Sequence, residues 1–253
     1  MTHLRLLSLD FDGTMVGPWQ DGKAAVSEDL VNCLEALRKA GVLLAMNTGR
    51  TLALVDQAME LFPVTPDFAL TTEREIFRWT ADGWEPFSDW NEQCLQDHEE
   101  LYADAKHLLV EIEAYIAHER SARLHREFGR MVGLVAHTDA EMDRIVDYLR
   151  VQCQRVANLS FQRNSVYLRF CHAVYDKGSV LKALQVRLGI QPNETFAAGD
   201  NFNDLPMLNP SIAEHLACPA NSVDEVKATV RRYGGYVAEL AGGDGVAEAL
   251  RRI

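Results

Sequence analysis

The sequence predicts an α/β protein whose core is a doubly wound, mainly parallel, Rossmann-like sheet, with a smaller α+β domain inserted within it. Short apolar segments that end in polar clusters alternate with amphipathic helical patterns, which is typical of parallel βαβ units. The alternation stops at about residue 84 and resumes at about residue 171. We therefore expect a discontinuous core domain of residues 1–83 and 171–253 and an inserted domain of residues 84–170.

The first part of the core is predicted to alternate strands and helices. Leu6–Leu9 and Val42–Met46 are short apolar runs of the kind found in buried parallel strands. Between them, Ser27 is a typical helix N-cap, and the amphipathic segment behind it ends at Gly41. A second helical pattern leads to a third expected strand, Asp67–Thr72.

The middle of the chain departs from this alternation. Residues 76–79 and 84–87 flank Asp82-Gly83 and predict a hairpin, in which Trp79, Trp84 and Trp90 are expected to pack. The insert is then predicted to contain a helical region, a strand, a helix and two strands, over residues 91–126, 131–137, 139–150 and 159–170.

The core pattern resumes with a helix that begins at Asp176-Lys177-Gly178. Thr195–Gly199 predicts another buried strand, which ends in the acidic cluster of residues 200–204. A short helix is expected at residues 205–208, and the remaining segment, 213–253, predicts two helices and one or two short strands.

Composition limits the classes of partner. The chain has 37 acidic and 25 basic residues, a formal charge of −12, so nucleic acid is not an expected partner. Five cysteines without a CxxC pair predict free thiols rather than disulfides or zinc. No apolar run reaches the ~18 residues of a membrane span, so we expect a soluble, cytoplasmic protein. We also expect a monomer or a small homo-oligomer. Four histidines of the insert are expected to be solvated, namely His98, His107, His118 and His125.

Polar side chains follow three of the predicted strands. Asp10 and Asp12 lie two residues apart at the end of the first strand, so both carboxylates can face one site. Asp200 follows a later strand, and the carboxyl ends of parallel strands meet at one edge of the sheet. Carboxylate oxygens without histidine or cysteine favour Mg²⁺ over zinc. The sequence therefore predicts a magnesium site at this edge.

A phosphate site is expected beside the acids. Thr48 and the amide of Gly49 lie at the start of a predicted helix, where they are suited to hydrogen-bond a phosphate. Lys177 can neutralise both the phosphate and an attacking carboxylate. Arg50 is expected either to contact the substrate or to brace the helix that follows it.

Four motifs resemble those of the haloacid dehalogenase (HAD) superfamily of phosphatases, and they occur in the order found in that family. They are Asp10-Phe11-Asp12-Gly13-Thr14, Asn47-Thr48-Gly49-Arg50, Lys177, and Gly199-Asp200-Asn201-Phe202-Asn203-Asp204. The insert between the second and third motifs is similar to the type IIB cap of the Cof-like, sucrose-phosphatase-like members.

The resemblance implies a mechanism. Asp10 is expected to attack phosphorus and form an aspartyl-phosphate, while Asp12 protonates the leaving oxygen and then deprotonates the attacking water. By the same resemblance, Mg²⁺ is held by Asp10, by the backbone carbonyl of Asp12 and by Asp200. Asp204 is expected to support the metal indirectly, and Asn203 to help bind phosphate.

The expected function is hydrolysis of a small phosphorylated metabolite, a sugar phosphate or a related phosphomonoester. A phosphomutase on the same scaffold is one alternative, and a binding module regulated by phosphorylation of an aspartate is another. Mg²⁺ is the implied cofactor in the leading interpretation.

The segment after the third strand departs from the family pattern. Cof-like relatives commonly carry an Asn-Gly pair there, whereas this chain has Thr72-Glu73-Arg74-Glu75. Arg74 is expected either to bind a second anionic group of the substrate or, as we favour, to pair with Glu73 and Glu75 on the surface.

Overall fold

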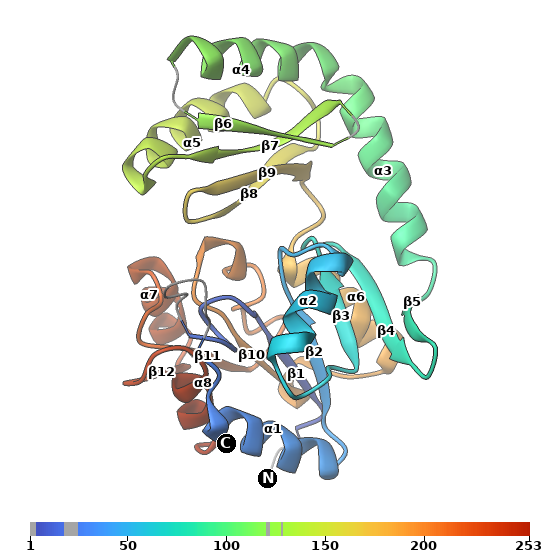
Figure 1. Ribbon diagram of the computed structural model, residues 1–253, viewed down its shortest axis with the longest axis vertical. Coiled ribbons are helices and arrows are strands. Elements are labelled where there is room, and N and C mark those ends of the chain that lie inside the picture. The colour runs from blue at the N-terminus through green and yellow to red at the C-terminus, as the bar shows by residue number, and fades with distance from the viewer. Residues whose placement is uncertain (1–3, 18–24, 120–121, 128) are drawn as a thin grey trace. The chain divides into compact units, whose positions relative to one another are not determined.

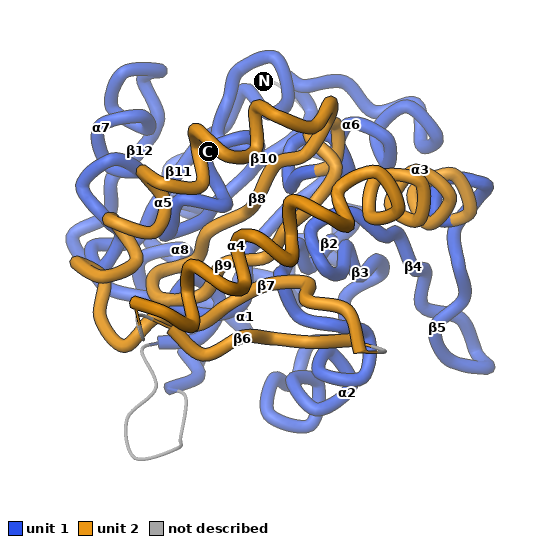
Figure 2. The backbone as a smooth tube through the Cα atoms, turned by 90° about the horizontal axis from the view of Figure 1, so that it is seen from above, with its two compact units in different colours: residues 1–91, 176–253 blue, residues 92–175 orange. Residues whose placement is uncertain are grey.

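The structure is a computed structural model that describes residues 4–17, 25–119, 122–127 and 129–253. The chain divides into two compact units, which we call unit 1 (residues 1–91 and 176–253) and unit 2 (residues 92–175) (Figure 2). These borders correct the expected ones, 84 and 170. Residues Gly83–Pro86 form strand β5, which is part of the unit 1 sheet, and strand β9 of unit 2 continues to His172.

Unit 1 is built on an eight-stranded sheet in the order β12-β11-β10-β1-β2-β3-β4-β5 (Figure 1). Its strands are β1 (Leu6–Leu9), β2 (Leu43–Asn47), β3 (Phe68–Thr71), β4 (Glu75–Thr80), β5 (Gly83–Pro86), β10 (Thr195–Ala198), β11 (His215–Cys218) and β12 (Tyr236–Val237). The strands from β12 to β3 are parallel, while β4 and β5 pair antiparallel. The predicted core strands and the hairpin are confirmed, and Trp79 and Trp84 pack edge to face across the hairpin.

Helices cover both faces of this sheet. One face packs against α1 (Glu28–Lys39), α2 (Leu52–Leu61) and α8 (Gly242–Leu250), and the other against α6 (Lys177–Leu188) and α7 (Asp224–Arg232). The alternation of side chains along β1 explains the two layers, because Leu7 and Leu9 enter the first core and Leu6 enters the second. The predicted doubly wound architecture is therefore confirmed.

Capping residues fix where the helices begin. The Ser27 hydroxyl accepts a hydrogen bond from the Leu30 amide at the start of α1 (3.0 Å). In α6, the Asp176 carboxylate accepts from the Ser179 amide (2.7 Å), so the helix starts at Lys177. The short helix expected at 205–208 is instead a 3₁₀ turn, η2 (Phe202–Asp204), one turn earlier, because Asn201 caps it.

Unit 2 combines three helices with a four-stranded antiparallel sheet in the order β6-β7-β9-β8. Its elements are α3 (Trp90–Asp104, whose first two residues belong to unit 1), α4 (Lys106–Glu119), β6 (Ala122–Glu127), β7 (Arg130–Ala136), α5 (Asp139–Cys153), β8 (Leu159–Asn164) and β9 (Tyr167–His172). The expected helical region 91–126 is wrong at its end. Residues 122–127 form an edge strand that pairs with β7, and its apolar residues Ala122 and Leu124 alternate as a strand requires.

One histidine of unit 2 is not solvated as expected. His98 is buried, its Nδ1–H donates to the Cys94 carbonyl (2.7 Å), and its Nε2 accepts from the His172 amide (3.2 Å). Both ring nitrogens are therefore used, Nδ1 within α3 and Nε2 between α3 and β9.

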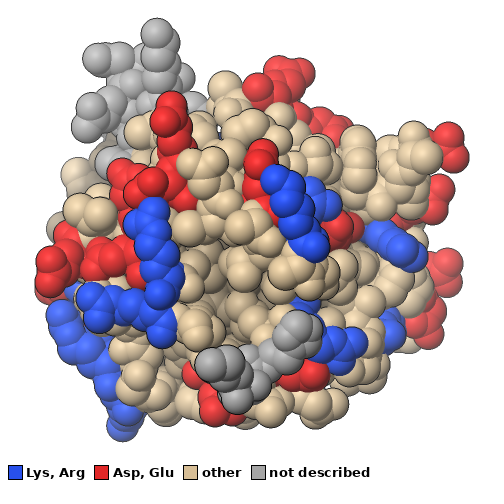
Figure 3. All heavy atoms as spheres, turned by 90° about the horizontal axis from the view of Figure 1, so that it is seen from below, with Lys and Arg blue, Asp and Glu red and all other residues tan. Residues whose placement is uncertain are grey.

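Two further observations concern membrane-spanning helices and surface charge. Within the described residues, no helix has the length and apolar character needed to cross a membrane. On the face shown in Figure 3, Lys and Arg side chains lie beside Asp and Glu side chains, so this face presents mixed charge among its described residues.

Candidate active site

Two buried ion pairs form the centre of the candidate site. The Lys177 ammonium lies 2.6 Å from Oδ1 of Asp10 and 2.6 Å from Oδ1 of Asp204. All three side chains are excluded from solvent, with Lys177 at 0% exposure. Charge-assisted hydrogen bonds at this distance are strong, and they fix the two carboxylates on either side of one cation.

The sheet topology brings these residues together. Asp10 directly follows β1, and Asp204 lies just beyond β10, which is the parallel neighbour of β1. The Asp10 amide donates to the Ala198 carbonyl at the end of β10 (3.0 Å). Lys177 is the first residue of α6, and its carbonyl accepts from the side chain of Asn47, the last residue of β2 (3.0 Å). Three strand ends therefore meet at this site, as the sequence predicted.

Asp204 and Asp200 are held by contacts of their own. Oδ2 of Asp204 accepts from the amides of Asp200 (2.8 Å) and Asn201 (2.9 Å). Oδ1 of Asp200 accepts from the Thr14 hydroxyl (3.0 Å). Gly199 lets Asp204 approach, because a Cβ at position 199 would lie 2.3 Å from Cγ of Asp204. Both oxygens of Asp204 are thus engaged within the chain.

Burial and like charge shift the pKa values of these groups. Burial raises the pKa of Asp10 well above its usual range; Lys177 opposes this, whereas Asp204 and Asp200 add to it. Burial and the charge of Asp204 raise the pKa of Asp200 to about 7. Burial alone would lower the pKa of Lys177, but the charges of Asp10 and Asp204 outweigh it and raise that pKa above its usual value. Lys177 therefore stays charged, and a bound cation would favour the ionised aspartates.

The acids fit a divalent cation by their chemistry. Asp10, Asp200 and Asp204 each offer one carboxylate oxygen, and these oxygens lie within 4.8 Å of one another. A set of oxygen donors suits Mg²⁺ rather than zinc. Because Asp204 already bonds Lys177 and two amides, Asp10 and Asp200 are the carboxylates better placed to hold the ion directly.

The Asp12 carboxylate binds a different side chain from the one that the Asp10 carboxylate binds. The Asp12 carboxylate forms a bidentate pair with Arg50, at 2.7 Å from Nε to Oδ2 and 2.7 Å from Nη2 to Oδ1. The guanidinium also lies 5.0 Å above the ring of the buried Phe11 and donates to the Leu54 carbonyl in α2 (3.3 Å). Arg50 thus contacts the helix that follows it and also fixes Asp12, a pairing that was not predicted from the sequence.

The expected phosphate-binding residues lie around the same centre. Thr48 and Gly49 follow β2, and Thr48 is buried with its hydroxyl oxygen accepting from the Arg50 amide (3.2 Å). Asn203 is buried in η2, and its Nδ2 donates to Oε1 of Glu73 (2.6 Å).

Glu73 lies at the candidate site, although the sequence predicted a surface position. It is only 8% exposed, so the expected surface pairing of Arg74 with Glu73 is wrong. Two consecutive left-handed residues, Thr72 and Glu73, turn the chain inward after β3. In the sequence, the departure of this segment from the family pattern indicated that it was unusual. It did not indicate that the Glu73 side chain points into the site.

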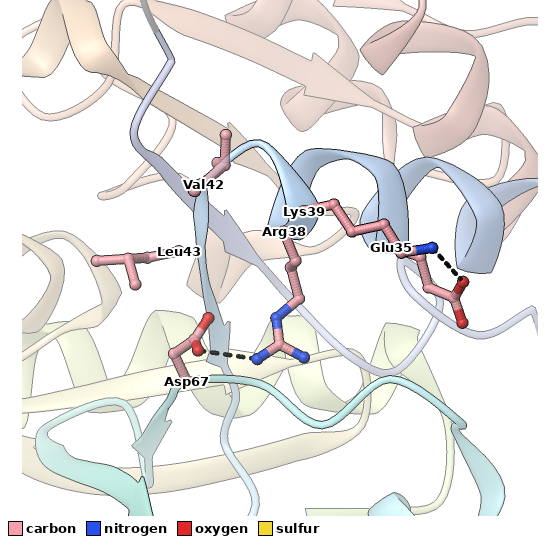
Figure 4. Close-up of a pocket in the computed structure, with 7 residues that line it drawn as sticks. Glu35, Arg38, Lys39, Val42, Leu43 and Asp67 are labelled. Atoms are coloured by element: carbon pink, nitrogen blue, oxygen red, sulfur yellow. Dashed lines mark hydrogen bonds and ion pairs between the residues drawn. The ribbon is translucent and has the colours of Figure 1, made fainter.

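A pocket of about 390 Å³ lies elsewhere, at the amino-terminal ends of β2 and β3 (Figure 4). It is lined by Glu35, Arg38, Lys39, Gly41, Val42, Leu43 and Asp67. Its charges are paired, since Arg38 contacts Asp67 (2.9 Å) and Lys39 contacts Glu35 (3.6 Å). Because the candidate site is at the carboxyl ends of the same strands, this pocket is separate from it.

Comparison with known proteins gives matches over most of the chain. The model of the haloacid dehalogenase-like hydrolases matches residues 88–250. A phosphoglycolate phosphatase of Methanopyrus kandleri is 27% identical over 253 residues, covering 98% of this chain and 96% of that protein. A phosphoglycolate phosphatase of Methanothermobacter thermautotrophicus is 25% identical over 254 residues, covering 99% of each chain.

Solved structures share the fold. The sucrose-phosphatase of Synechocystis, determined with sucrose and phosphate, has a TM-score of 0.72 at 19% identity, covering 99% of this chain and 98% of that one. A phosphatase of the same superfamily from Bacteroides thetaiotaomicron has a TM-score of 0.63 at 18% identity, covering 99% and 95%. At these identities the likeness concerns the fold alone.

Proposed function

Because the chain belongs to the haloacid dehalogenase-like hydrolase family and is a phosphoric monoester hydrolase, we propose that it cleaves a small phosphorylated metabolite through an aspartyl-phosphate, with Mg²⁺ as cofactor. The observation that carries this proposal is the buried Lys177 between Asp10 and Asp204, with Asp200 beside them. This arrangement provides an attacking carboxylate, a fixed positive charge and oxygen donors for a cation in one place.

Asp10 is the proposed nucleophile. One of its oxygens accepts from Lys177, and the other carboxylate oxygen would attack phosphorus as the bond from phosphorus to the ester oxygen breaks. Lys177 neutralises part of the charge that gathers on the phosphoryl group. Asp10, Asp200 and the backbone carbonyl of Asp12 would hold Mg²⁺, which would supply further positive charge there. Asp204 would support this arrangement through Lys177 and through the amides that donate to its carboxylate.

Asp12 is the proposed proton carrier. It would give a proton to the leaving ester oxygen, and in the second step it would take one from the water that releases phosphate from Asp10. Its pair with Arg50 fixes the carboxylate in position but favours its ionised form. We infer that Asp12 must loosen from Arg50 when it carries the proton.

Thr48, the Gly49 amide and Asn203 are proposed to hold the phosphate, and unit 2 to act as the cap that selects the rest of the substrate. A sugar phosphate or a related phosphomonoester is the proposed substrate class. Support comes from the fold shared with a sucrose-phosphatase and from relatives named phosphoglycolate phosphatases.

Phosphate release from a panel of sugar phosphates, phosphoglycolate and related esters, with and without Mg²⁺, tests this proposal. We expect stoichiometric release of phosphate without a bisphosphate activator, and loss of turnover in Asp10→Asn. Asp82→Asn, an exposed hairpin aspartate, serves as the matched control and should keep wild-type activity. Transfer of phosphate between sugar positions would favour a mutase, and a tenth or more of wild-type activity in Asp10→Asn would remove Asp10 as nucleophile.

A further inference from the structure

The turn after β3 is strained and firmly attached to the loop after β2. Thr72 and Glu73 have φ values of 49° and 65°, a left-handed conformation that is unfavourable for residues other than glycine, asparagine and aspartate. The Thr72 amide donates to the Arg50 carbonyl (2.9 Å), and the Glu73 amide donates to the Thr48 carbonyl (3.2 Å). Strain of this kind persists where surrounding contacts impose it, often at functional sites. The consequence here is that a carboxylate enters the candidate site.

The Glu73 carboxylate lies among the groups that we propose bind phosphate. Its Oε1 accepts from Nδ2 of Asn203 at 2.6 Å and lies 3.2 Å from the position that a Cβ on Gly49 would take. Its negative charge is also among the causes that raise the pKa of Lys177. Glu73 and Asn203 are 8% and 1% exposed, so water screens this charge poorly. Oδ1 of Asn203 has no hydrogen-bond partner among the described residues, so the contact with Glu73 defines how the amide is oriented.

We propose that Glu73 is a built-in anion that weakens the binding of inorganic phosphate and so helps the product to leave. This inference rests on the proposed function, because it takes Asn203 and Gly49 as phosphate-binding groups. Glu73 acts in two ways. It occupies one of the two Nδ2 hydrogens of Asn203, and it places a buried negative charge beside a bound anion. The same contact could instead help by orienting Asn203, but like charge at low dielectric should outweigh one hydrogen bond.

Glu73→Gln tests this inference, because it keeps the size and an acceptor oxygen but removes the charge. The inhibition constant of inorganic phosphate, measured at saturating Mg²⁺, should fall about tenfold or more, which is about 1.4 kcal/mol tighter binding. Calorimetric titration of the Mg²⁺-loaded protein with inorganic phosphate should show the same shift without any turnover. Glu75→Gln is the matched control. Its carboxylate accepts from the Thr72 hydroxyl (2.8 Å) rather than from Asn203, so phosphate binding should not change.

The outcomes separate the two proposals. If the Glu73→Gln protein is folded and binds phosphate as weakly as the wild type, or more weakly, the inference is overturned. The proposed function still stands in that case, provided that the wild-type protein releases phosphate from an ester. Failure of both the wild type and the variant to bind phosphate overturns the inference, and it overturns the proposed function as well if the wild type also releases no phosphate from any ester of the panel. Glu73→Ala is made in parallel, so that a folding defect in one variant leaves the other to decide.

Discussion

Replacing Lys177 by methionine should destabilise the protein strongly near pH 8. Lys177→Met keeps an unbranched side chain but removes the charge that contacts Asp10 and Asp204, each at 2.6 Å. None of these side chains is more than 4% exposed, so the carboxylates left behind cannot be solvated. Removing one partner from a buried ion pair costs about 3–5 kcal/mol. We expect the free energy of unfolding to fall by about that amount.

The loss should be smaller at pH 5. Burial already raises the pKa of Asp10 in the folded protein, and Lys177 is the charge that opposes this rise. Without Lys177 that pKa rises further, so folded Asp10 holds a proton over a wider pH range than unfolded Asp10 does. A folded state that binds more protons than the unfolded state loses stability as the pH rises. At pH 5 the variant can therefore keep Asp10 neutral, whereas at pH 8 it cannot do so at low cost.

Urea denaturation of the metal-free protein at both pH values measures this difference. Lys182→Met, which changes an exposed lysine on the same helix, should leave the free energy of unfolding within about 0.5 kcal/mol of wild type. An equal loss for Lys177→Met at pH 5 and pH 8 would refute the electrostatic reasoning, and so would a loss below about 1 kcal/mol at pH 8.

Two other substitutions probe single contacts. Arg50→Lys cannot reproduce the bidentate pair with Asp12, so we expect kcat to fall tenfold or more; the free energy of unfolding should barely change, because the pair is partly exposed. Steady-state kinetics with a melting curve would check this, and unchanged kcat would contradict it. Gly199→Ala would force Asp204 to move, with an expected cost of about 1–3 kcal/mol and weaker stabilisation by Mg²⁺ in thermal melts. A variant as stable as wild type, with the same response to Mg²⁺, would show that Asp204 need not lie so close to residue 199.

The sequence predicted the fold of unit 1 well, because its local patterns and its tertiary structure agree. Ser27 and Asp176 cap their helices where the pattern indicated, and each apolar run became a buried strand. Prediction failed where pairing partners decide the structure. Strand β6 depends on its pairing with β7, which local periodicity does not indicate. The pairing of β5 with β4 was predicted from the turn residues, but the domain border was placed at that turn, so β5 was assigned to the insert.

In the candidate site, too, some features could be predicted from the sequence and others could not. Strand ends in a parallel sheet converge by topology, so the meeting of Asp10, Lys177 and Asp204 could be predicted from order alone. The direction in which individual side chains point could not be predicted from the sequence. Asp12 turns to Arg50 because the guanidinium fits its carboxylate. Glu73 turns inward because backbone bonds impose a left-handed turn that its residue type would not choose.

The central place of β1 in the unit 1 sheet determines when the site can form during synthesis. Leu6 of β1 pairs with Thr195 of β10, so a growing chain that has completed unit 2 still has one side of β1 without its partner strand. Unit 2 is continuous in sequence and can complete its own sheet earlier. Unit 1 must then close by contacts between distant parts of the chain, which are slow to form. We therefore expect the inserted unit to fold ahead of its host and the site to be assembled last.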